Sequence, residues 1–512
     1  MTISSAAEVS DSERSPLLHN YAGGGVVDYQ GRPADRSKTG CWRSAFFIIG
    51  VELGERFAYY GISSNLINYL TGSLGQSKAR AAENVNTWYG VASVTPLLGA
   101  FIADSYLGRY RTILIASLLY ILGLSLLTLS AVLPSVSSPD LAVAQGGHKP
   151  CVQAFGADQF DGKDSKEGKA RSSFFNWWYL GLVGGPEAAL IFLNYIQDNL
   201  NWGLGFGIPC ISMAMALVVF LMGTRTYRYT VKGQEKNPFF RIGKVFANAA
   251  RNWRTTNSVI LNEMEAQGTL RPESSHQYNP PIWVSCLVYA IVFAQPPTFF
   301  TEQGTTMDRT IWPGFDIPPA SLQLFIGIPI IFLIPIYDRF FVPFARAITG
   351  KPSGITVLQR IGIGMFVSIM CMIVAAIVEM KRLEIAMESG LVDKPEATIP
   401  MSFWWLVPQY LLIGIADVFT IVGLQEFFYS QVPNELRSAG LSLYLSVMGV
   451  GSLLSSFLVS VIDKTTSKEG YDSWFSDNLN LAHLDYFYWL LAGLSIVGLV
   501  SFSYFAKSYI YR

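Results

Sequence analysis

Three charged residues stand close together in an otherwise uncharged stretch near the N-terminus. Glu52, Glu55 and Arg56 lie within the run 45–70, which carries no other charge. Their spacing of three and four residues places the side chains on one face of a helix, within reach of one another. A carboxylate beside a guanidinium holds a proton weakly and a buried carboxylate holds it tightly, so a change of exposure can load and release a proton. The pattern predicts proton coupling through these three residues.

The composition indicates where this helix lies. Of 512 residues, 51% are hydrophobic and only 14% are charged, compared with about 25% charged in soluble proteins. A charge at the centre of a bilayer costs about 2.5–3.5 kcal/mol, so such residues face a partner or a water-filled cavity. We therefore expect an integral protein of the lipid bilayer. The alternative, a helix end whose charges reach water at the interface, fits poorly with three charges well inside the run.

Apolar stretches of spanning length recur along the whole chain. A helix needs roughly 20 apolar residues to cross the hydrocarbon core. We predict helices at 44–70, 84–103, 112–136, 139–157, 172–197, 200–223, 281–303, 317–337, 355–379, 402–430, 437–462 and 484–506. The expected fold is all-α and multi-pass, a major facilitator fold of two six-helix bundles, with helix 4 shortened.

Basic residues set the expected orientation, because lysine and arginine accumulate in cytosolic loops. With the N-terminus inside the cell, most of the 37 basic residues fall on cytosolic segments. The predicted parts are a disordered cytosolic tail at 1–43, a six-helix bundle at 44–224, a cytosolic linker at 225–280, a second six-helix bundle at 281–507 and a cytosolic tail at 508–512.

Two further charged residues inside predicted spans could take part in the same chemistry. Lys149 is the only basic residue in any predicted span besides Arg56, so it needs an anionic partner. The candidates are Glu52 and Glu55 in the first span. Glu426, in the tenth span, could face a cationic group of a substrate.

Other charges are open to more than one interpretation. Asp417 is better explained as a hydrogen-bond partner between helices than as a site residue. Glu302, at the outer end of the seventh span, could be a gate residue or an interfacial one, and Glu187, after a Gly-Gly-Pro segment, receives no role. Asp104 and Arg109 lie on a tight cytosolic turn, where a charged pair could latch one conformation of a rocking carrier.

A short sorting pattern lies near the N-terminus. Glu13, Leu17 and Leu18 fit the acidic dileucine motif that sorting adaptors bind, and the alternative is a tail without a signal. The predicted location is the vacuolar membrane, with the plasma membrane as the alternative.

Several other classes of protein are disfavoured. The net charge of zero offers no clustered basic surface of the kind that nucleic acid binding requires. The five cysteines lie apart, without the spacing of a metal site or a disulfide framework. The four histidines are scattered along the chain rather than grouped as metal ligands. We therefore expect no enzymatic activity, no cofactor and no metal.

Together these segments resemble the proton-dependent oligopeptide transporter family, and more closely its plant branch of nitrate/peptide transporters. Glu52, Glu55 and Arg56 match the family's E-x-x-E-R motif of helix 1. Lys149 matches its lysine before proline in helix 4, and Glu426 matches its helix 10 acid. Further segments that look like family signatures are 155–161, 175–179 and 482–489.

The resemblance implies secondary active transport, with a proton and a small polar solute as partners. It also implies that Arg56, Tyr59 and Tyr60 line the substrate pocket together with Lys149 and Glu426. Lys149 would couple to the acids of helix 1.

Departures from the family pattern bear on the solute and on activity. Peptide-transporting members usually have a helix 5 asparagine where this chain has Val183, and the well-studied nitrate member has a helix 7 histidine where it has Phe293. We favour nitrate or a similar anion, because Arg56 and Lys149 remain as anion partners, with di- and tripeptides as the alternative. The segment before Lys149 and the linker are shorter than is usual in the family. A transport-inactive splice form or sensor is therefore the alternative of another class.

Overall fold

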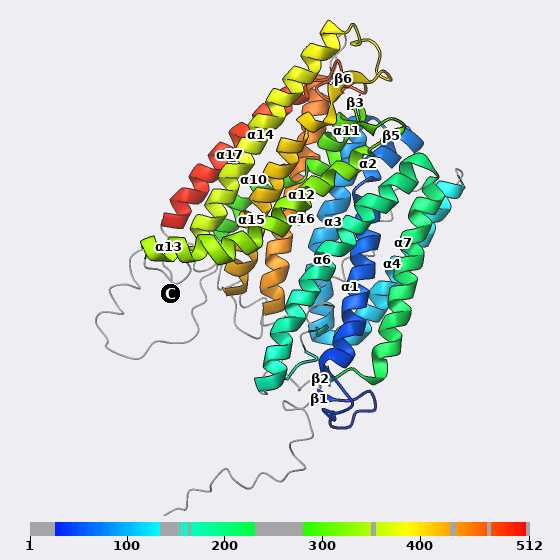
Figure 1. The fold of residues 1–512 in the computed structure, drawn as a ribbon, viewed down its shortest axis with the longest axis vertical. Coiled ribbons are helices and arrows are strands. Elements are labelled where there is room, and N and C mark those ends of the chain that lie inside the picture. Colours follow the sequence, from blue (N-terminus) through cyan, green and yellow to red (C-terminus); the bar gives the residue numbers. More distant parts are fainter. Residues whose placement is uncertain are drawn as a thin grey trace, which may run out of the picture.

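The computed structural model describes residues 26–133, 152, 155–156, 158–161, 165–230, 280–349, 355–430, 437–467 and 473–507. Long helices dominate these residues and run roughly alongside one another in two groups (Figure 1). Eight helical stretches of this part of the chain are long and apolar enough to cross a membrane. The predicted all-α, multi-pass fold is confirmed.

The first group of helices is built around α1 (Cys41–Ser63), which packs between α6 and α7, while α4 packs on α7. Asn201 caps α7 by accepting hydrogen bonds from the first backbone N–H groups of that helix. The elements of this N-terminal half, besides α1, are α2 (Leu66–Asn68), η2 (Tyr69–Ser73), α3 (Lys78–Ile102), η3 (Ala103–Leu107), α4 (Arg109–Val132), α6 (Ser165–Asn199), α7 (Trp202–Met222) and η6 (Gly223–Arg225).

The second group is centred on α14 (Val357–Glu388), which packs against α15 and α17, while α10 packs against α16 and α17. Thr356 and Gln359 form a capping box at the start of α14. The elements of this C-terminal half, besides α14, are α10 (Pro280–Phe293), η7 (Pro296–Phe300), α11 (Thr301–Thr305), η8 (Pro319–Gln323), α12 (Leu324–Ile336), η9 (Tyr337–Phe341), α13 (Val342–Thr349), η10 (Phe403–Trp405), α15 (Val407–Ser430), α16 (Arg437–Thr466) and α17 (Leu484–Lys507).

Every predicted helix except the fourth has a counterpart in these two groups. The predicted span 139–157, which holds Lys149, lies outside the described residues apart from Val152, Phe155 and Gly156. The predicted linker likewise lies outside them from residue 231 to residue 279. The division of the chain into five parts stays a prediction.

Short strands join segments that are distant in sequence. β1 (Val26–Val27) pairs antiparallel with β2 (Tyr229–Thr230), and β3 (Met307–Asp308) pairs in parallel with β6 (Ile399–Ser402). β4 (Thr310–Trp312) and β5 (Phe315–Asp316) form a hairpin. Residues 26–40 fall in the segment predicted as a disordered tail, yet they have a defined structure, because β1 pairs with the chain that follows α7.

The helix α14 runs beyond the predicted end at residue 379, because a buried ion pair holds its last turns. Arg382 and Glu379 are both fully buried, and the Arg382 Nη2 atom lies 2.6 Å from Glu379 Oε1. Arg382 also donates to the Asn480 side chain and to the carbonyl of Leu479, on the segment before α17. The pair therefore ties the end of α14 to that segment.

Replacing Arg382 by methionine should destabilise the protein strongly, because it leaves the Glu379 carboxylate buried without its cation. Breaking a buried pair in this way costs about 3–5 kcal/mol. Thermal unfolding of the purified protein in detergent measures the effect. Lys381→Met is the matched control, because Lys381 pairs with Glu384 at the surface, and it should unfold close to the wild type. Equal unfolding temperatures for the two variants would contradict the assignment.

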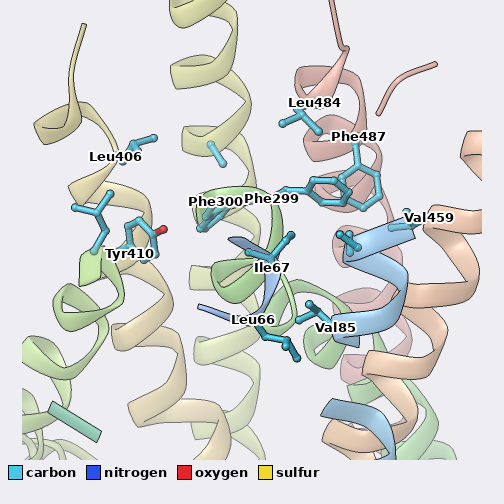
Figure 2. Close-up of a cluster of buried hydrophobic side chains, with 14 of the residues drawn as sticks. Leu66, Ile67, Val85, Phe299, Phe300, Leu406, Tyr410, Val459, Leu484 and Phe487 are labelled. Atoms are coloured by element: carbon cyan, nitrogen blue, oxygen red, sulfur yellow. The ribbon is translucent and has the colours of Figure 1, made fainter. Parts of the chain in front are cut away.

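The two halves pack together at one end and along α3 and α16, where Gly90 and Gly449 let the two helices approach closely. We call the end that holds residues 63–78 and 300–323 the outer end, and the end that holds residues 41, 108 and 225 the inner end. At the outer end one hydrophobic cluster joins both halves, with Ile67 and Val85 from the first and Phe299 and Phe487 from the second (Figure 2).

At the inner end each half has a hydrophobic cluster of its own. Ile48, Phe155 and Phe220 belong to the cluster of the first half, and Ile361 and Phe427 belong to that of the second. Because apolar packing joins the halves at the outer end and not between the inner clusters, the described residues have an arrangement closed at the outer end.

Candidate functional site

The charged face of α1 forms a compact ion cluster. The Arg56 Nε atom donates to Glu52 Oε1 at 2.7 Å and lies 3.5 Å from Glu55 Oε2. Both carboxylates are fully buried, while 13% of the Arg56 side chain is exposed. The pairing that the i, i+3, i+4 spacing predicts is therefore present. The cluster contains two acids and one base, so binding of one proton leaves the guanidinium with a single charged partner.

Small residues allow neighbouring helices to approach α1 closely on both sides. A Cβ added at Gly54 would lie 2.9 Å from the Cβ of Ala216 on α7. A Cβ added at Gly185 of α6 would lie 2.8 Å from the Arg56 Cβ and 3.0 Å from the carbonyl oxygen of Leu53. Backbones in membranes come this close where glycine lies at the crossing. Gly185 therefore fixes the position of the α1 backbone directly at the ion cluster.

Replacing Gly185 by alanine should displace α1 at Arg56 and reduce both thermal stability and transport. A contact under 3 Å between carbons forces the backbone to shift, and overpacking of this kind typically costs about 1–3 kcal/mol. Gly184→Ala is the matched control, because a Cβ at Gly184 meets nothing within 4 Å and alanine favours the helix over glycine by about 1 kcal/mol. Thermal unfolding should rank Gly184→Ala at or above the wild type and Gly185→Ala well below it. The reverse order would contradict this packing.

Aromatic side chains surround the outer edge of the ion cluster. Tyr59 stacks on Trp88 of α3 with ring centroids 5.3 Å apart, and its ring meets that of Tyr60 edge to face at 5.2 Å. Tyr60 lies within electrostatic range of Arg56 and also of Asp417 and Tyr444 in the other half. The helix 1 residues Arg56 and Tyr60 are therefore turned toward the C-terminal half of the protein.

The second half contributes two acids at different depths. Asp417 of α15 is buried and accepts a hydrogen bond from the Tyr289 hydroxyl of α10, so the predicted contact between helices is confirmed. Glu426 lies farther along α15, with 53% of its side chain exposed and its Oε2 atom 3.8 Å from Arg360 Nη1. Glu426 thus keeps an open side, while Arg360 is held by the Val418 carbonyl and lies over the Tyr337 ring.

Several predicted site residues cannot be placed. Lys149 lies outside the described residues, as do Glu13, Leu17 and Leu18 of the sorting pattern. Of the predicted latch, Asp104 is described only in its backbone. Arg109 forms an ion pair with Asp158, a residue of the same half, and the latch stays a prediction.

A polar seam closes the outer end between the halves. The Lys78 Nζ atom of α3 lies 2.5 Å from Glu302 Oε2 of α11, and Thr71 of η2 donates to the same carboxylate at 3.1 Å. Only 1% of Glu302 is exposed. Gln323 of η8 adds a bond across the seam to the carbonyl oxygen of Ser64 at 2.9 Å. Of the two interpretations of Glu302, the structure supports the gate over an interfacial position.

Sequence reasoning missed Lys78, the partner of Glu302. The predicted second helix begins at residue 84, whereas α3 begins at Lys78, so this lysine counted only as a loop charge. A basic residue less than two turns before an apolar span is a signal that could have extended the helix. Nothing in the local pattern pairs it with a residue more than 200 positions away.

The helices that can span a membrane form two halves, and these halves close on each other at the outer end. A buried cluster of acids and a base in one half faces the other half. These features define a multi-pass membrane transporter. The family model described as "PTR2: POT family" matches residues 110–276 and 279–475. The chain belongs to the POT family and, within it, to the plant NRT1/PTR proteins.

Relatives and solved structures agree with this assignment. The Arabidopsis thaliana protein NRT1/PTR FAMILY 5.10 is 57% identical over an alignment of 558 residues that covers 100% of this chain and 99% of the relative. NRT1/PTR FAMILY 5.14 of the same plant is 55% identical, over 95% of this chain and 96% of the relative.

A crystal structure of an autoinhibited POT family peptide transporter superimposes with a TM-score of 0.72, at 22% identity over 92% of this chain and 98% of that one. The POT family transporter PepTSo gives a TM-score of 0.68 at 23% identity, over 91% and 98% of the two chains. These likenesses show the shared fold, which is of the major facilitator type.

Proposed function

We propose that this protein is a proton-coupled carrier that moves a small polar anion such as nitrate across a membrane. The observation that supports it best is the buried cluster of Glu52, Glu55 and Arg56 on a helix that faces the opposite half. Charges inside the membrane are costly and mark ion or proton pathways. One of the two carboxylates can bind a proton while the other still balances the charge of Arg56.

Proton binding and anion binding are linked through Arg56 in this mechanism. While Glu52 is ionised, it occupies the Arg56 guanidinium at 2.7 Å. Protonation of a carboxylate weakens that ion pair, and the guanidinium, whose exposed part faces the opposite half, becomes available to an anion. Lys149, which lies outside the described residues, is proposed as a second cation for the anion. Release of the proton restores the pair with Glu52 and expels the anion.

Rocking of the two halves would expose the site alternately. The seam of Lys78 and Glu302 acts as the outer gate, which is closed in this structure. Asp104 of η3 and Arg109 at the start of α4 serve as the latch of the opposite state. In that state Arg109 leaves Asp158 and binds a partner in the other half.

Short peptides are the second candidate solute. Glu426 supports them, because its half-exposed carboxylate in the C-terminal half could hold an amino group while Arg56 in the other half holds a carboxylate. Two departures from the family pattern affect the choice of solute, one weighing against peptides and the other against nitrate. Val183 replaces the asparagine usual in peptide-transporting members, and Phe293 replaces the histidine of the well-studied nitrate member.

A transport-inactive form or sensor is the competing class. The alignment with NRT1/PTR FAMILY 5.10 runs over 558 residues, more than the 512 of this chain. Positions of that relative therefore have no counterpart here, which agrees with the shortened segments predicted before Lys149 and in the linker.

Uptake into proteoliposomes tests these alternatives together. The purified full chain is reconstituted, and entry of labelled nitrate and of a labelled dipeptide is followed with and without an inward proton gradient. The proposal expects nitrate entry that the gradient accelerates, and weaker entry of the dipeptide. Faster dipeptide entry would make peptides the substrate, and no gradient-driven entry of either solute would favour the inactive form.

We propose that the carrier resides in the vacuolar membrane and is sorted there by Glu13, Leu17 and Leu18. Replacing Leu17 and Leu18 by alanine should remove the signal and move a fluorescent fusion to the plasma membrane, as microscopy in plant cells can show. Val26→Ala and Val27→Ala together serve as the control, because they change the same segment outside the motif. An unchanged vacuolar location of the dileucine variant would contradict the signal.

A further inference from the structure

Glu187 is an acidic residue in the membrane region that the mechanism above does not use. It lies on α6 directly after Gly184, Gly185 and Pro186, and it reaches across to α12 in the other half. A Cβ added at Gly327 of α12 would occupy the space of Glu187 Oε1. The carboxylate therefore fits into a notch that exists because residue 327 has no side chain.

The notch offers the carboxylate no charged partner. Glu187 is half-buried, and it has no hydrogen bond or ion pair with any residue that the structure describes. The elements packed against α6 are α1, α7, η8 and α12. Of these, α7, η8 and α12 contain no acidic or basic residue, and α12 is entirely apolar in sequence.

The remaining charges near these helices already have partners of their own. On α1, Glu52 and Glu55 pair with Arg56. Asp198 near the end of α6 accepts a hydrogen bond from Asn65, and Asp417 on α15, behind α12, accepts one from Tyr289. Glu187 is thus set apart from the acid and base cluster, although it follows Gly185, which contacts Arg56, by only two residues.

The contact between Glu187 and Gly327 belongs to the outer seam. One turn and two turns farther along α6, the Leu190 carbonyl accepts a bond from Ser321 Oγ at 2.7 Å, and Asn194 Nδ2 lies 3.4 Å from the same hydroxyl. Ser321 precedes Gly327 by six residues on the same segment of the C-terminal half. Opening of the outer end separates these contacts and exposes Glu187 to water from that side.

We propose that Glu187 is a proton-dependent closing contact, which must bind a proton before the outer end of the carrier can close. An ionised carboxylate loses its hydration when it enters an apolar notch without a cation, and that cost is large. A neutral carboxyl group loses far less, so protonation favours the closed seam over the open one. The proton bound from outside would thereby help to commit the carrier to its inward-facing state. This inference rests on the proposed proton coupling and adds a second acid to it.

Glu187→Gln and Gly327→Ala separate the charge of the contact from its shape. Glutamine keeps the size of the side chain and is permanently neutral, so it should favour the closed seam at every pH. Alanine at 327 fills the notch, so it should disfavour closure whether or not residue 187 is neutral. Asp198→Asn is the matched control for loss of an acid on α6. Asp198 has a polar partner in Asn65 and lies within electrostatic range of Arg309 in the other half, so its neutralisation gives no gain of closure.

Distances between spin labels on the full chain in lipid nanodiscs report the closure without any solute. Labels are placed on cysteines introduced at Asn199, the last residue of α6, and at Met387, near the end of α14 and 64% exposed. The same chain without these two cysteines gives the background. Spectra are recorded at acid and at neutral pH, and each is resolved into outer-closed and outer-open populations.

The proposal expects the ratio of closed to open wild-type protein to rise on acidification. In Glu187→Gln the ratio at neutral pH should already be about tenfold higher than in the wild type, which corresponds to one pH unit of linkage. Gly327→Ala should lower the ratio both in the wild type and in Glu187→Gln, and Asp198→Asn should not raise it. Equal ratios for the wild type and Glu187→Gln at neutral pH would overturn the proposal.

The outcome is independent of the proposed transport function. If proton-driven uptake is present in proteoliposomes and the label distances of Glu187→Gln match those of the wild type, this inference fails and the function stands. If uptake is absent while the closed population rises in Glu187→Gln, the closing contact stands and the function fails.

Discussion

Replacing Glu52 by glutamine should abolish proton-driven uptake while leaving exchange of solute across the membrane intact. Glutamine keeps the shape of the side chain, so Arg56 retains a hydrogen-bond acceptor at the position of the 2.7 Å contact. The variant cannot lose or gain a proton at residue 52, so net uptake loses its driving force. Exchange of labelled for unlabelled solute moves no net proton and survives.

The size of the effect distinguishes coupling from binding. Gradient-driven uptake in proteoliposomes should fall at least about a hundredfold, equivalent to roughly 2.7 kcal/mol, with exchange within a factor of a few of the wild type. Glu384→Gln is the matched control, since Glu384 is half-exposed and, among the described residues, forms its ion pair with Lys381. Loss of exchange together with uptake would show that Glu52 acts in binding or folding instead of coupling.

Reversing the charge of Lys78 should open the outer gate and stop transport. In Lys78→Glu, two carboxylates would face each other where Lys78 and Glu302 now lie 2.5 Å apart. Because Glu302 is 1% exposed, this repulsion is poorly screened by water and should disfavour the outer-closed state strongly. Uptake should fall to background, and a membrane-impermeant thiol reagent should modify a cysteine introduced at Thr71 far faster than in the wild type.

The double variant Lys78→Glu with Glu302→Lys tests the pairing itself. Exchanging the two charges restores an ion pair with reversed sign, so a substantial part of the uptake should return. Arg80→Glu is the matched control, because Arg80 lies on the same turn and has no described contact with Glu302. If the double variant is no more active than either single variant, the two residues act separately and the gate assignment is wrong.

Helix content and the main site could be predicted from the sequence because both depend on local pattern. Apolar runs of spanning length give the helices, and the three-and-four spacing of Glu52, Glu55 and Arg56 brings their charges together on one helix. The end of α14 was misjudged for a reason that is not local. The predicted helix ends at residue 379, whereas α14 continues because Glu379 and the segment before α17 neutralise and bury Arg382.

Contacts between the halves could not be predicted from the sequence. Lys78 and Glu302, or Glu187 and Gly327, are joined only by the way in which two bundles dock, and no periodicity encodes that docking. Gly327 illustrates the difficulty, since it matters only because the lack of a side chain leaves room for the Glu187 carboxylate. The ion pair of Arg109 with Asp158, which lies 49 residues away, is likewise a contact that no local pattern predicts.

The proposed coupling of solute to protons is tested most directly by measuring whether protons enter together with the solute. Proteoliposomes containing the full chain and a trapped pH-sensitive dye receive an inward nitrate gradient with equal pH on both sides and the membrane potential clamped. The account predicts that the interior acidifies as nitrate enters, and that Glu52→Gln shows no acidification. Nitrate entry at the wild-type rate without any change of internal pH would contradict proton coupling.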